Sequence, residues 1–363
     1  MKSKIEVKKK KVSEVNIMVA IATVFVIFIH TSSEAFWYYD KGSLYSIIVY
    51  TFNKILSFAV PCFIFMSGFK LSHSKKIISL KDYVCFLKRR IIKIYLPYVL
   101  IAAIYIYYLS KHNYINMNIT QMIVSILRGD FSSPFYFIVI IMQFYIIFPV
   151  FQRIINKKNS WIVLILAIFI SMYFKVVVLK SNIEGNILIN FYKNQSDRIF
   201  ISYLAYFVFG SVFSINYEDV KKNIKPSLVI IFYMTALSLH TYLCYINYLG
   251  IRYYKYAEVG HMIFCLISIV ALWLLAYKMD CKISDKRLHI FKKISAASYY
   301  IYLIHVLIMY YVDDYITVHI EKVYISFFVR SLLVIAISFT LAFFINYINI
   351  NISQKKRSSN SLY

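Results

Sequence analysis

The chain has 363 residues, 61% of them hydrophobic, and a formal net charge of +25. Soluble globular proteins are usually about 45–50% apolar, so this excess excludes a single compact soluble domain. The basic residues lie in short segments between apolar runs and not on one soluble face, which argues against nucleic-acid binding.

Long apolar runs recur along the whole chain, and runs of 18 or more residues are typical of membrane-spanning helices. No alternation of period two appears, and open strands cannot satisfy their backbone groups in lipid. We therefore expect an all-α, polytopic membrane protein with one transmembrane domain over 15–350, a basic segment over 1–14 and a short basic tail over 351–363. The predicted spans number about ten: 15–37, 47–71, 91–110, 134–154, 160–179, 198–215, 226–246, 258–277, 294–312 and 323–349.

The distribution of charge predicts the orientation. With the N-terminus inside, most of the 41 Lys and Arg residues fall in the inside segments, as the positive-inside rule requires. These segments are 1–14, 70–93, 153–158, 221–225, 278–293 and 355–357. We therefore expect both termini in the cytoplasm and the chain in the cell membrane, where anionic lipid adds to the attraction.

The first span ends in VFVIFIHTSSE, Val24 to Glu34, which places a histidine and a carboxylate beside an apolar run. His30 lies about 22 Å along the helix from Val15, in the outer half of the lipid layer. Ionisable groups at that depth usually face a cavity or a partner. Glu34 is four residues on and shares a helix face with His30, so it is able to fix the imidazole tautomer that a general base needs. The alternative is an interfacial histidine with a solvated Glu34.

The second span contains FAVPCFIFMSGFKL, Phe58 to Leu71. Pro61 interrupts the helical hydrogen-bond ladder, and Ser67-Gly68 allows another helix to approach closely. We interpret this stretch as a packing kink and not as a ligand site.

The third span begins in KRRIIKIYLPY, Lys88 to Tyr98. Arg89, Arg90 and Lys93 lie at its inner end, where guanidinium and ammonium groups are suited to phosphates. The alternative interpretation is an ordinary anchor at the inner membrane surface.

Two later spans carry polar groups. SSPFYFIVIIMQFYIIFP contains Gln143 and Tyr145, which either hold helices together or contact substrate. SYYIYLIHVLIMYY contains His305 in mid-span, which either lines the same cavity as His30 or donates to a backbone carbonyl.

The remaining polar features are less specific. The five cysteines form no CxxC pair, so we expect neither a disulfide framework nor a metal site; they are Cys62, Cys85, Cys244, Cys265 and Cys281. The outer loops around 111–133 and 180–198 offer Asp130, Glu184 and Asp197 for recognition of an acceptor, although loop carboxylates are more often only solvated.

Together these motifs resemble the membrane-bound acyltransferase-3 family, over residues from about 14 to about 350. The resemblance is carried by NIMVAIATVFVIFIH ending in His30, VPCFIFMSGF, KRRIIKIYLPY, YLAYFVFG at 203–210 and SYYIYLIH at 298–305. Within the family, the chain looks most like the bacterial branch that modifies secreted or intercellular-adhesin polysaccharides.

The resemblance implies roles for several residues. His30 matches the catalytic histidine of the family, Arg90 and Lys93 match a basic pair before the third span, and His305 matches a later histidine. The family has a basic residue eleven positions before its catalytic histidine, and this position is Val19 here. Either the cations near Arg90 take over its role, or the chain is altered as an acyltransferase.

The expected function is O-acyl transfer. An acyl-coenzyme A donor, with acetyl as the common case in the family, binds its phosphates at Arg89, Arg90 and Lys93 as a substrate and not as a tightly bound cofactor. His30, held by Glu34, removes a proton from a hydroxyl of a cell-surface or exported glycan, while His305, Gln143 and Tyr145 contact substrate. Glycan-synthesis proteins are possible partners. The alternative is a transporter that exports a polysaccharide or a lipid-linked sugar without acyltransferase chemistry.

Overall fold

The computed structural model describes residues 12–38, 42–74, 76–179, 186–254, 258–320 and 322–360, with side chains except those of 34–38, 323–324 and 352–360. These residues form helices and connecting segments and contain no strand. The first half contains α1 (Glu14–Tyr38), α2 (Leu44–Leu56), α3 (Ala59–His73), α4 (Leu80–Arg90), η1 (Ile91–Tyr95), α5 (Leu96–Lys111), α6 (Ile119–Arg128), η2 (Ser133–Phe135), α7 (Tyr136–Ile154), α8 (Ser160–Tyr173) and η3 (Phe174–Val178). The second half contains α9 (Ile187–Gln195), η4 (Phe200–Tyr203), α10 (Leu204–Ile215), α11 (Tyr217–Asn223), α12 (Pro226–Tyr248), α13 (Val259–Lys282), α14 (Asp285–Tyr315), η5 (Thr317–His319) and α15 (Val323–Asn360).

The predicted all-α membrane architecture is confirmed. Within the described residues, nine helical segments are long and apolar enough to cross a membrane. The sixth predicted span, 198–215, differs: its helical part covers only Phe200–Ile215 and forms a bent pair with α9, at an angle of 55°. The third also differs, because its helix begins at Leu80 and not near residue 91.

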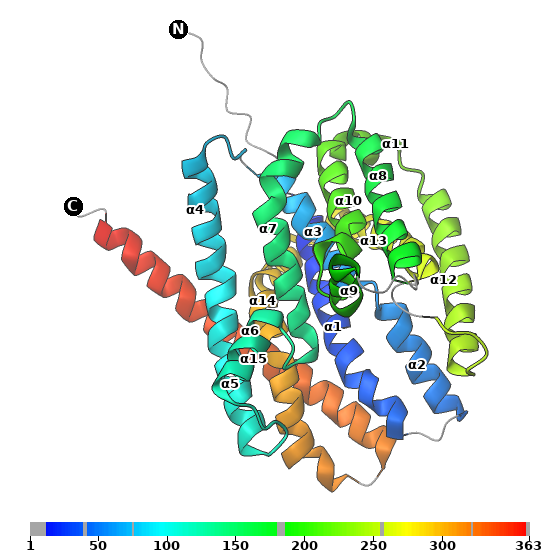
Figure 1. The fold of residues 1–363 in the computed structure, drawn as a ribbon, viewed down its shortest axis with the longest axis vertical. Coiled ribbons are helices and arrows are strands. Elements are labelled where there is room, and N and C mark those ends of the chain that lie inside the picture. Colours follow the sequence, from blue (N-terminus) through cyan, green and yellow to red (C-terminus); the bar gives the residue numbers. More distant parts are fainter. Residues whose placement is uncertain are drawn as a thin grey trace.

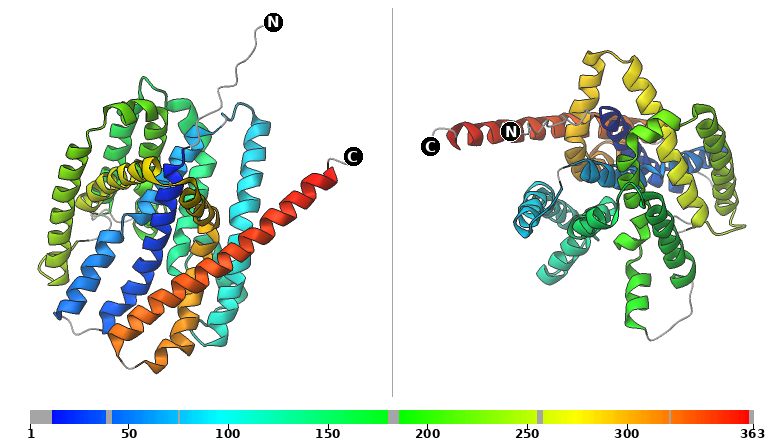
Figure 2. Two further views of the ribbon diagram at one scale, coloured as in Figure 1. Left: turned by 180° about the vertical axis from the view of Figure 1, so that it is seen from behind. Right: turned by 90° about the horizontal axis from the view of Figure 1, so that it is seen from above.

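The helix α1 lies at the centre of the bundle and packs against α2, α3, α13, α14 and α15 (Figure 1). A first apolar core surrounds α3 and α10, and a second lies between α5, α14 and α15. The last helix, α15, crosses one face of the bundle diagonally and its C-terminal part projects beyond it (Figure 2). The central position of α1 places His30 inside the protein and away from lipid.

Contacts between connecting segments define two ends of the bundle. At one end, Ser13 donates to the carboxylate of Asp280 at 2.9 Å, and Lys157 pairs with Asp219 at 2.8 Å. At the other end, Tyr108 donates to the carboxylate of Asp314 at 2.6 Å. Residues of segments predicted inside thus contact one another at one end, and residues beside segments predicted outside contact one another at the other.

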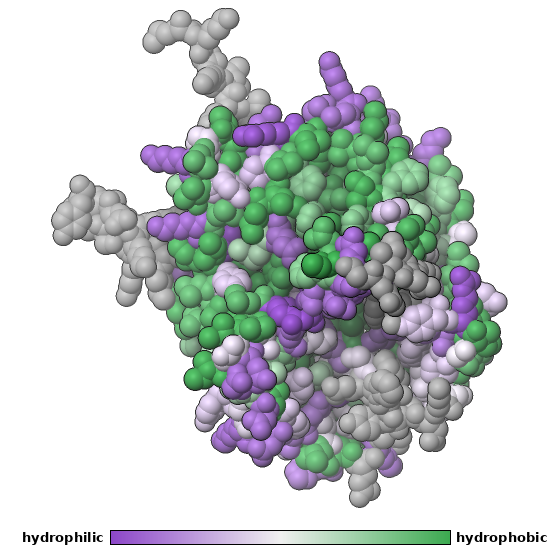
Figure 3. Space-filling view, viewed as in Figure 1, coloured by the Kyte–Doolittle hydropathy of each residue, from purple (hydrophilic) through white to green (hydrophobic). Residues whose placement is uncertain are grey.

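The outer surface is largely apolar over the long helices (Figure 3). Large side chains are exposed along α5, α8 and α12, among them Leu100, Tyr107, Ile162, Phe169, Ile231 and Phe232. A soluble protein rarely exposes apolar surface this continuous, whereas lipid covers it in a membrane. The chain is therefore a multi-pass membrane protein, which in bacteria places it in the plasma membrane.

Candidate functional site

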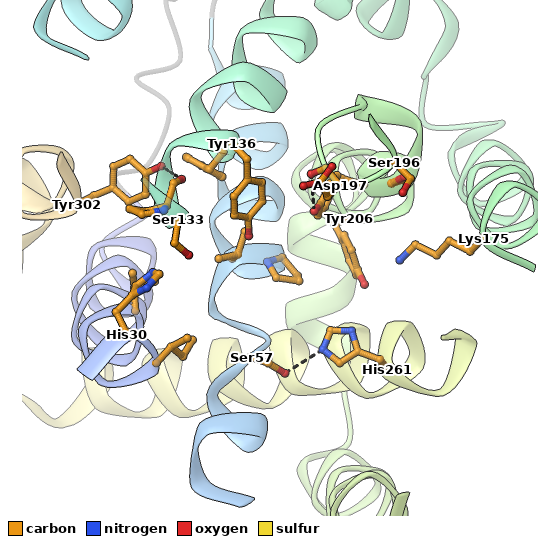
Figure 4. A pocket seen from close by; sticks show the side chains of 18 of the residues that line it. His30, Ser57, Ser133, Tyr136, Lys175, Ser196, Asp197, Tyr206, His261 and Tyr302 are labelled. Atoms are coloured by element: carbon orange, nitrogen blue, oxygen red, sulfur yellow. Dashed lines mark hydrogen bonds between the residues drawn. The ribbon is translucent and has the colours of Figure 1, made fainter. Parts of the chain in front are cut away.

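A cavity of about 600 Å³ lies inside the bundle, beside α1 (Figure 4). Its walls come from α1, the α2–α3 junction, η2 and α7, η3, the segment from α9 to α10, α13 and α14. The polar residues of the lining are His30, Ser57, Ser133, Tyr136, Lys175, Lys193, Ser196, Asp197, Ser202, Tyr203, Tyr206, His261 and Tyr302. A hollow of this size with a few convergent polar groups is the usual form of a small-molecule site.

His30 lines one wall of this cavity. The ring is half-buried, and the ring of His305 lies behind it with the two centroids 5.1 Å apart. Nδ1 of His305 lies 2.8 Å from the carbonyl oxygen of Tyr302 and 3.1 Å from that of Ile301. Because a carbonyl only accepts, Nδ1 carries the proton and Nε2 keeps its lone pair. His305 does not line the cavity, so it makes the backbone contact that the sequence left open as one of two alternatives.

The backbone of α1 is held on both sides of His30. Asn53 on α2 donates from Nδ2 to the carbonyl of Ile29 at 2.7 Å, and Arg330 on α15 donates to the carbonyl of Thr31 at 2.7 Å. Arg330 also pairs with Asp313 on α14 at 3.1 Å. Two neighbouring helices thereby fix the segment that presents the imidazole. Glu34 continues α1 four residues later, but its side chain lies outside the described part, so its orienting role stays a prediction.

The opposite wall carries a cation and a second histidine. Lys175 comes from η3, a π-helical turn, and such turns occur frequently at functional sites. Nε2 of His261 lies 2.9 Å from Oγ of Ser57, whose hydroxyl also lies 2.6 Å from the carbonyl of Lys54. Because the serine proton goes to this carbonyl, His261 donates to Ser57. This contact is therefore structural and does not form a nucleophile–base pair.

Gln143 does not line the cavity but holds the backbone of a segment that does. Its Nε2 donates to the carbonyl of Arg198 at 2.7 Å, and its Oε1 accepts from the backbone N–H of Phe200 at 3.0 Å. These bonds satisfy backbone groups in the break between α9 and η4, where Ser196 and Asp197 line the cavity. Irregular backbone at membrane depth is tolerated where it is buried in protein or lines a cavity. Gln143 therefore holds helices together, and its predicted contact with substrate stays a prediction.

The predicted phosphate-binding cations lie elsewhere. Arg89 and Lys93 are exposed, while the guanidinium of Arg90 lies 5.0 Å from the ring of Phe86 and 5.1 Å from that of Tyr145. The lining of the cavity does not include the three cations or Tyr145. The structure thus brings Arg90 and Tyr145 together but separates both from the wall that holds His30.

The other predicted positions are accounted for as follows. Val19, where the family pattern has a cation, is 3% exposed and lies in the first apolar core. Asp130 is paired with Arg198 and with Arg128, whereas Asp197 lines the cavity. Glu184 lies outside the described residues.

Sequence reasoning missed Lys175, Ser57 and His261. Lys175 had a signal, because it is an ionisable residue inside the predicted span 160–179, and such residues are functional candidates by default. His261 is also an ionisable residue in a predicted span, but it lies near the start of the span 258–277, where the signal is weaker. Ser57 had none, since a serine within an apolar span is common.

Comparisons with known proteins identify the family of the chain. The sequence pattern described as "Acyltransferase domain" matches residues 12–347. The chain is 27% identical over 271 residues, 74% of its length and 73% of the relative's, to the "Probable poly-beta-1,6-N-acetyl-D-glucosamine export protein" of Staphylococcus aureus (strain MSSA476). It is 25% identical over 306 residues, 83% of its length and 82% of the relative's, to a protein of the same name from Staphylococcus epidermidis. No solved structure gives a significant match.

Proposed function

We propose, since this chain belongs to the acyltransferase-3 family, that it transfers an acyl group to a hydroxyl of a cell-surface or exported polysaccharide, with His30 as the general base. The donor in this proposal is a cytoplasmic acyl-coenzyme A, with acetyl as the transferred group. The observation that carries the proposal is the position of His30, half-buried on the wall of an internal cavity with a second histidine behind it. The names of the relatives, which refer to a polymer of N-acetylglucosamine, support a glycan acceptor.

The proposed reaction is a direct displacement at the thioester carbonyl. His30 takes the proton of the acceptor hydroxyl while the oxygen attacks the carbonyl carbon, which forms a tetrahedral intermediate. The carbon–sulfur bond then breaks, and the coenzyme A thiolate takes up the proton that His30 carries. General-base assistance of this kind contributes about 10²–10⁴-fold, and holding both substrates in one cavity adds to it.

The donor is proposed to place its phosphates at Arg89 and Lys93, whose side chains are exposed, and beside Arg90. We propose a route from Arg90 to the cavity along a row of tyrosines. Arg90 contacts Tyr145 at one end of this row. At the other end, Tyr302 lines the cavity, and its ring stacks on that of Tyr299 with the two centroids 6.5 Å apart. The pantetheine arm would have to pass along this row, so side chains there move when the donor binds.

The experiment that tests the proposal replaces His30 by alanine. We expect His30→Ala to abolish acyl transfer from radiolabelled acetyl-coenzyme A to oligosaccharide acceptors in proteoliposomes, while the protein stays folded in the membrane. His289→Ala, at an exposed histidine outside the cavity, is the matched control and should keep full activity. Transfer by His30→Ala at the rate of the unmodified protein would refute the proposal.

Export of a polysaccharide without acyl transfer is the second candidate, and the names of the relatives favour it. Deletion of the gene separates the two functions. Loss of an exporter leaves polymer inside the cell with unchanged acylation. Loss of the acyltransferase leaves polymer at the surface with reduced O-acyl content.

A further inference from the structure

Lys175 is a buried cation on the cavity wall, and no described residue gives it a counter-charge. Its side chain is 6% exposed, and Figure 4 shows its ammonium directed toward the cavity. Among the described residues, the structure gives it no hydrogen bond and no ion pair. Its ammonium faces the ring of Tyr206, with Nζ 5.8 Å from the ring centroid.

A charged ammonium is energetically unfavourable at this buried position unless an anion binds beside it. An ammonium removed from water loses its hydration, and buried charges in proteins are usually paired or hydrogen-bonded. The ring of Tyr206 offers only a cation–π contact, which replaces part of that hydration. The π-helical turn η3 (Phe174–Val178) changes the register of the helix at Lys175, as such turns do at functional sites.

The other ionisable groups of the lining do not neutralise Lys175. Lys193 on α9 is itself a cation with an interaction of its own, so it supplies no counter-charge. The carboxylate of Asp197 is largely exposed and lies 3.6 Å from the guanidinium of Arg198. His261 donates to Ser57, and His30 lies on the opposite wall. Within the part of the chain that the structure describes, Lys175 therefore has no counter-charge on the cavity wall.

We propose that this end of the cavity is a subsite for a compact anion, a carboxylate or a phosphate, carried by one of the two substrates. The inference rests on the proposed function and deepens it, because it makes the protein selective for an anionic acyl donor or an anionic acceptor. Lys175 binds the anion, and the reacting carbonyl lies at His30 across the cavity. The anion thereby holds the substrate at a point remote from the thioester carbonyl and the hydroxyl that react at His30.

The test measures binding of matched probes to the purified protein in detergent by calorimetry. For the donor, malonyl-coenzyme A is compared with acetyl-coenzyme A; for the acceptor, glucuronate and glucose 6-phosphate are compared with glucose. We expect the charged member of one set to bind at least about tenfold more tightly, as a charge-assisted hydrogen bond allows. Which set shows the preference identifies the source of the anion.

Lys175→Met should remove this preference, whereas Lys158→Met should keep it, because Lys158 is exposed at the start of the same membrane segment and lies outside the cavity. If Lys175→Met does not fold, Lys175→Gln removes the charge with a polar side chain. Retention of the preference without the lysine, or no preference in the unmodified protein, overturns the inference.

The variant His30→Ala separates this inference from the proposed function. It should lose acyl transfer and keep the binding preference, since Lys175 is intact. If the unmodified protein transfers no acyl group yet shows the preference, the proposed reaction fails and the anion subsite stands. If it transfers acyl groups without any preference, the subsite fails alone.

Discussion

At the scale of single residues, His30 depends on groups from other helices. The sequence predicted the histidine and its depth in the first span, because a polar side chain after an apolar run is visible in the pattern. It did not predict Asn53 and Arg330, which bind the backbone carbonyls of Ile29 and Thr31. These contacts join residues far apart in the chain, and spacing along one helix contains no information about them.

His305 is expected to act through His30 as a positioning residue. Its fixed tautomer and its ring, with the two centroids 5.1 Å apart, restrict the orientation of the His30 imidazole. We predict that His305→Phe, which keeps a ring and removes both nitrogens, lowers kcat about 100-fold with little change in KM, because misplaced catalytic groups cost about this much. Steady-state acyl transfer measures both constants. A rise in KM as large as the fall in kcat, or no change in either constant, contradicts this role.

Lys175 shows why sequence analysis can miss a functional candidate inside a predicted span. The span 160–179 was identified by its average hydropathy, and one lysine hardly changes that average. Only the structure shows that its ammonium lies on the same cavity as His30. The cations near Arg90 were identified by local clustering, yet they lie away from this cavity.

At the scale of elements, α3 and α10 touch backbone to backbone. A Cβ atom added to Gly68 would lie 2.1 Å from the carbonyl oxygen of Phe207, and one added to Gly210 would lie 1.9 Å from that of Phe65. The sequence predicted this kind of packing at Ser67-Gly68, because small residues let membrane helices approach closely. It did not identify α10 as the partner. Pro61 lies in the first turn of α3, so the kink begins just before it, at Ser57 and Phe58.

We predict that Gly210→Ala destabilises the protein by about 1–3 kcal/mol, because the obstructing atoms are backbone and cannot rotate away. The thermal unfolding midpoint of the purified protein in detergent measures the loss. Gly260→Ala is the matched control, since its added Cβ would meet side-chain atoms at 3.4 Å or more. Equal midpoints for the two variants would show that α3 and α10 separate at little cost.

The break between α9 and η4 could not be predicted from the sequence. The segment around residue 198 reads as the start of a span, since Phe200–Ile215 is apolar. Its backbone is satisfied by Gln143 from α7, a contact across 55 residues. A helix boundary that depends on such a partner is invisible to local patterns.

At the scale of the whole molecule, the alternation of spans agrees with the structure. The segments carrying most basic residues meet at one end, where Ser13 contacts Asp280 and the backbone N–H of Ile77 donates to Gln152 at 2.9 Å. The order of the spans follows from hydropathy and the grouping of loops follows from alternation, so both were predictable; the sixth predicted span is instead part of a bent pair of helices. The side of the membrane that each end faces is predicted by charge alone.

Two native cysteines are able to report that orientation. Cys85 on α4 and Cys281 near the end of α13 are exposed, whereas Cys62, Cys244 and Cys265 are buried. We predict that a membrane-impermeant maleimide leaves both exposed thiols unlabelled in intact cells and labels them in inside-out vesicles, because the positive-inside rule predicts that the basic end faces the cytoplasm.

The control places a cysteine at the other end of the bundle. Val318 is 66% exposed and follows α14 in η5, so Val318→Cys, with Cys85 and Cys281 changed to serine, should be labelled in intact cells. The reverse pattern would put the basic loops outside. It would also move any donor phosphates bound near Arg90 to the side of the membrane without coenzyme A. The orientation measured in this way therefore decides whether the cations near Arg90 are able to bind a cytoplasmic thioester, as the proposed reaction requires.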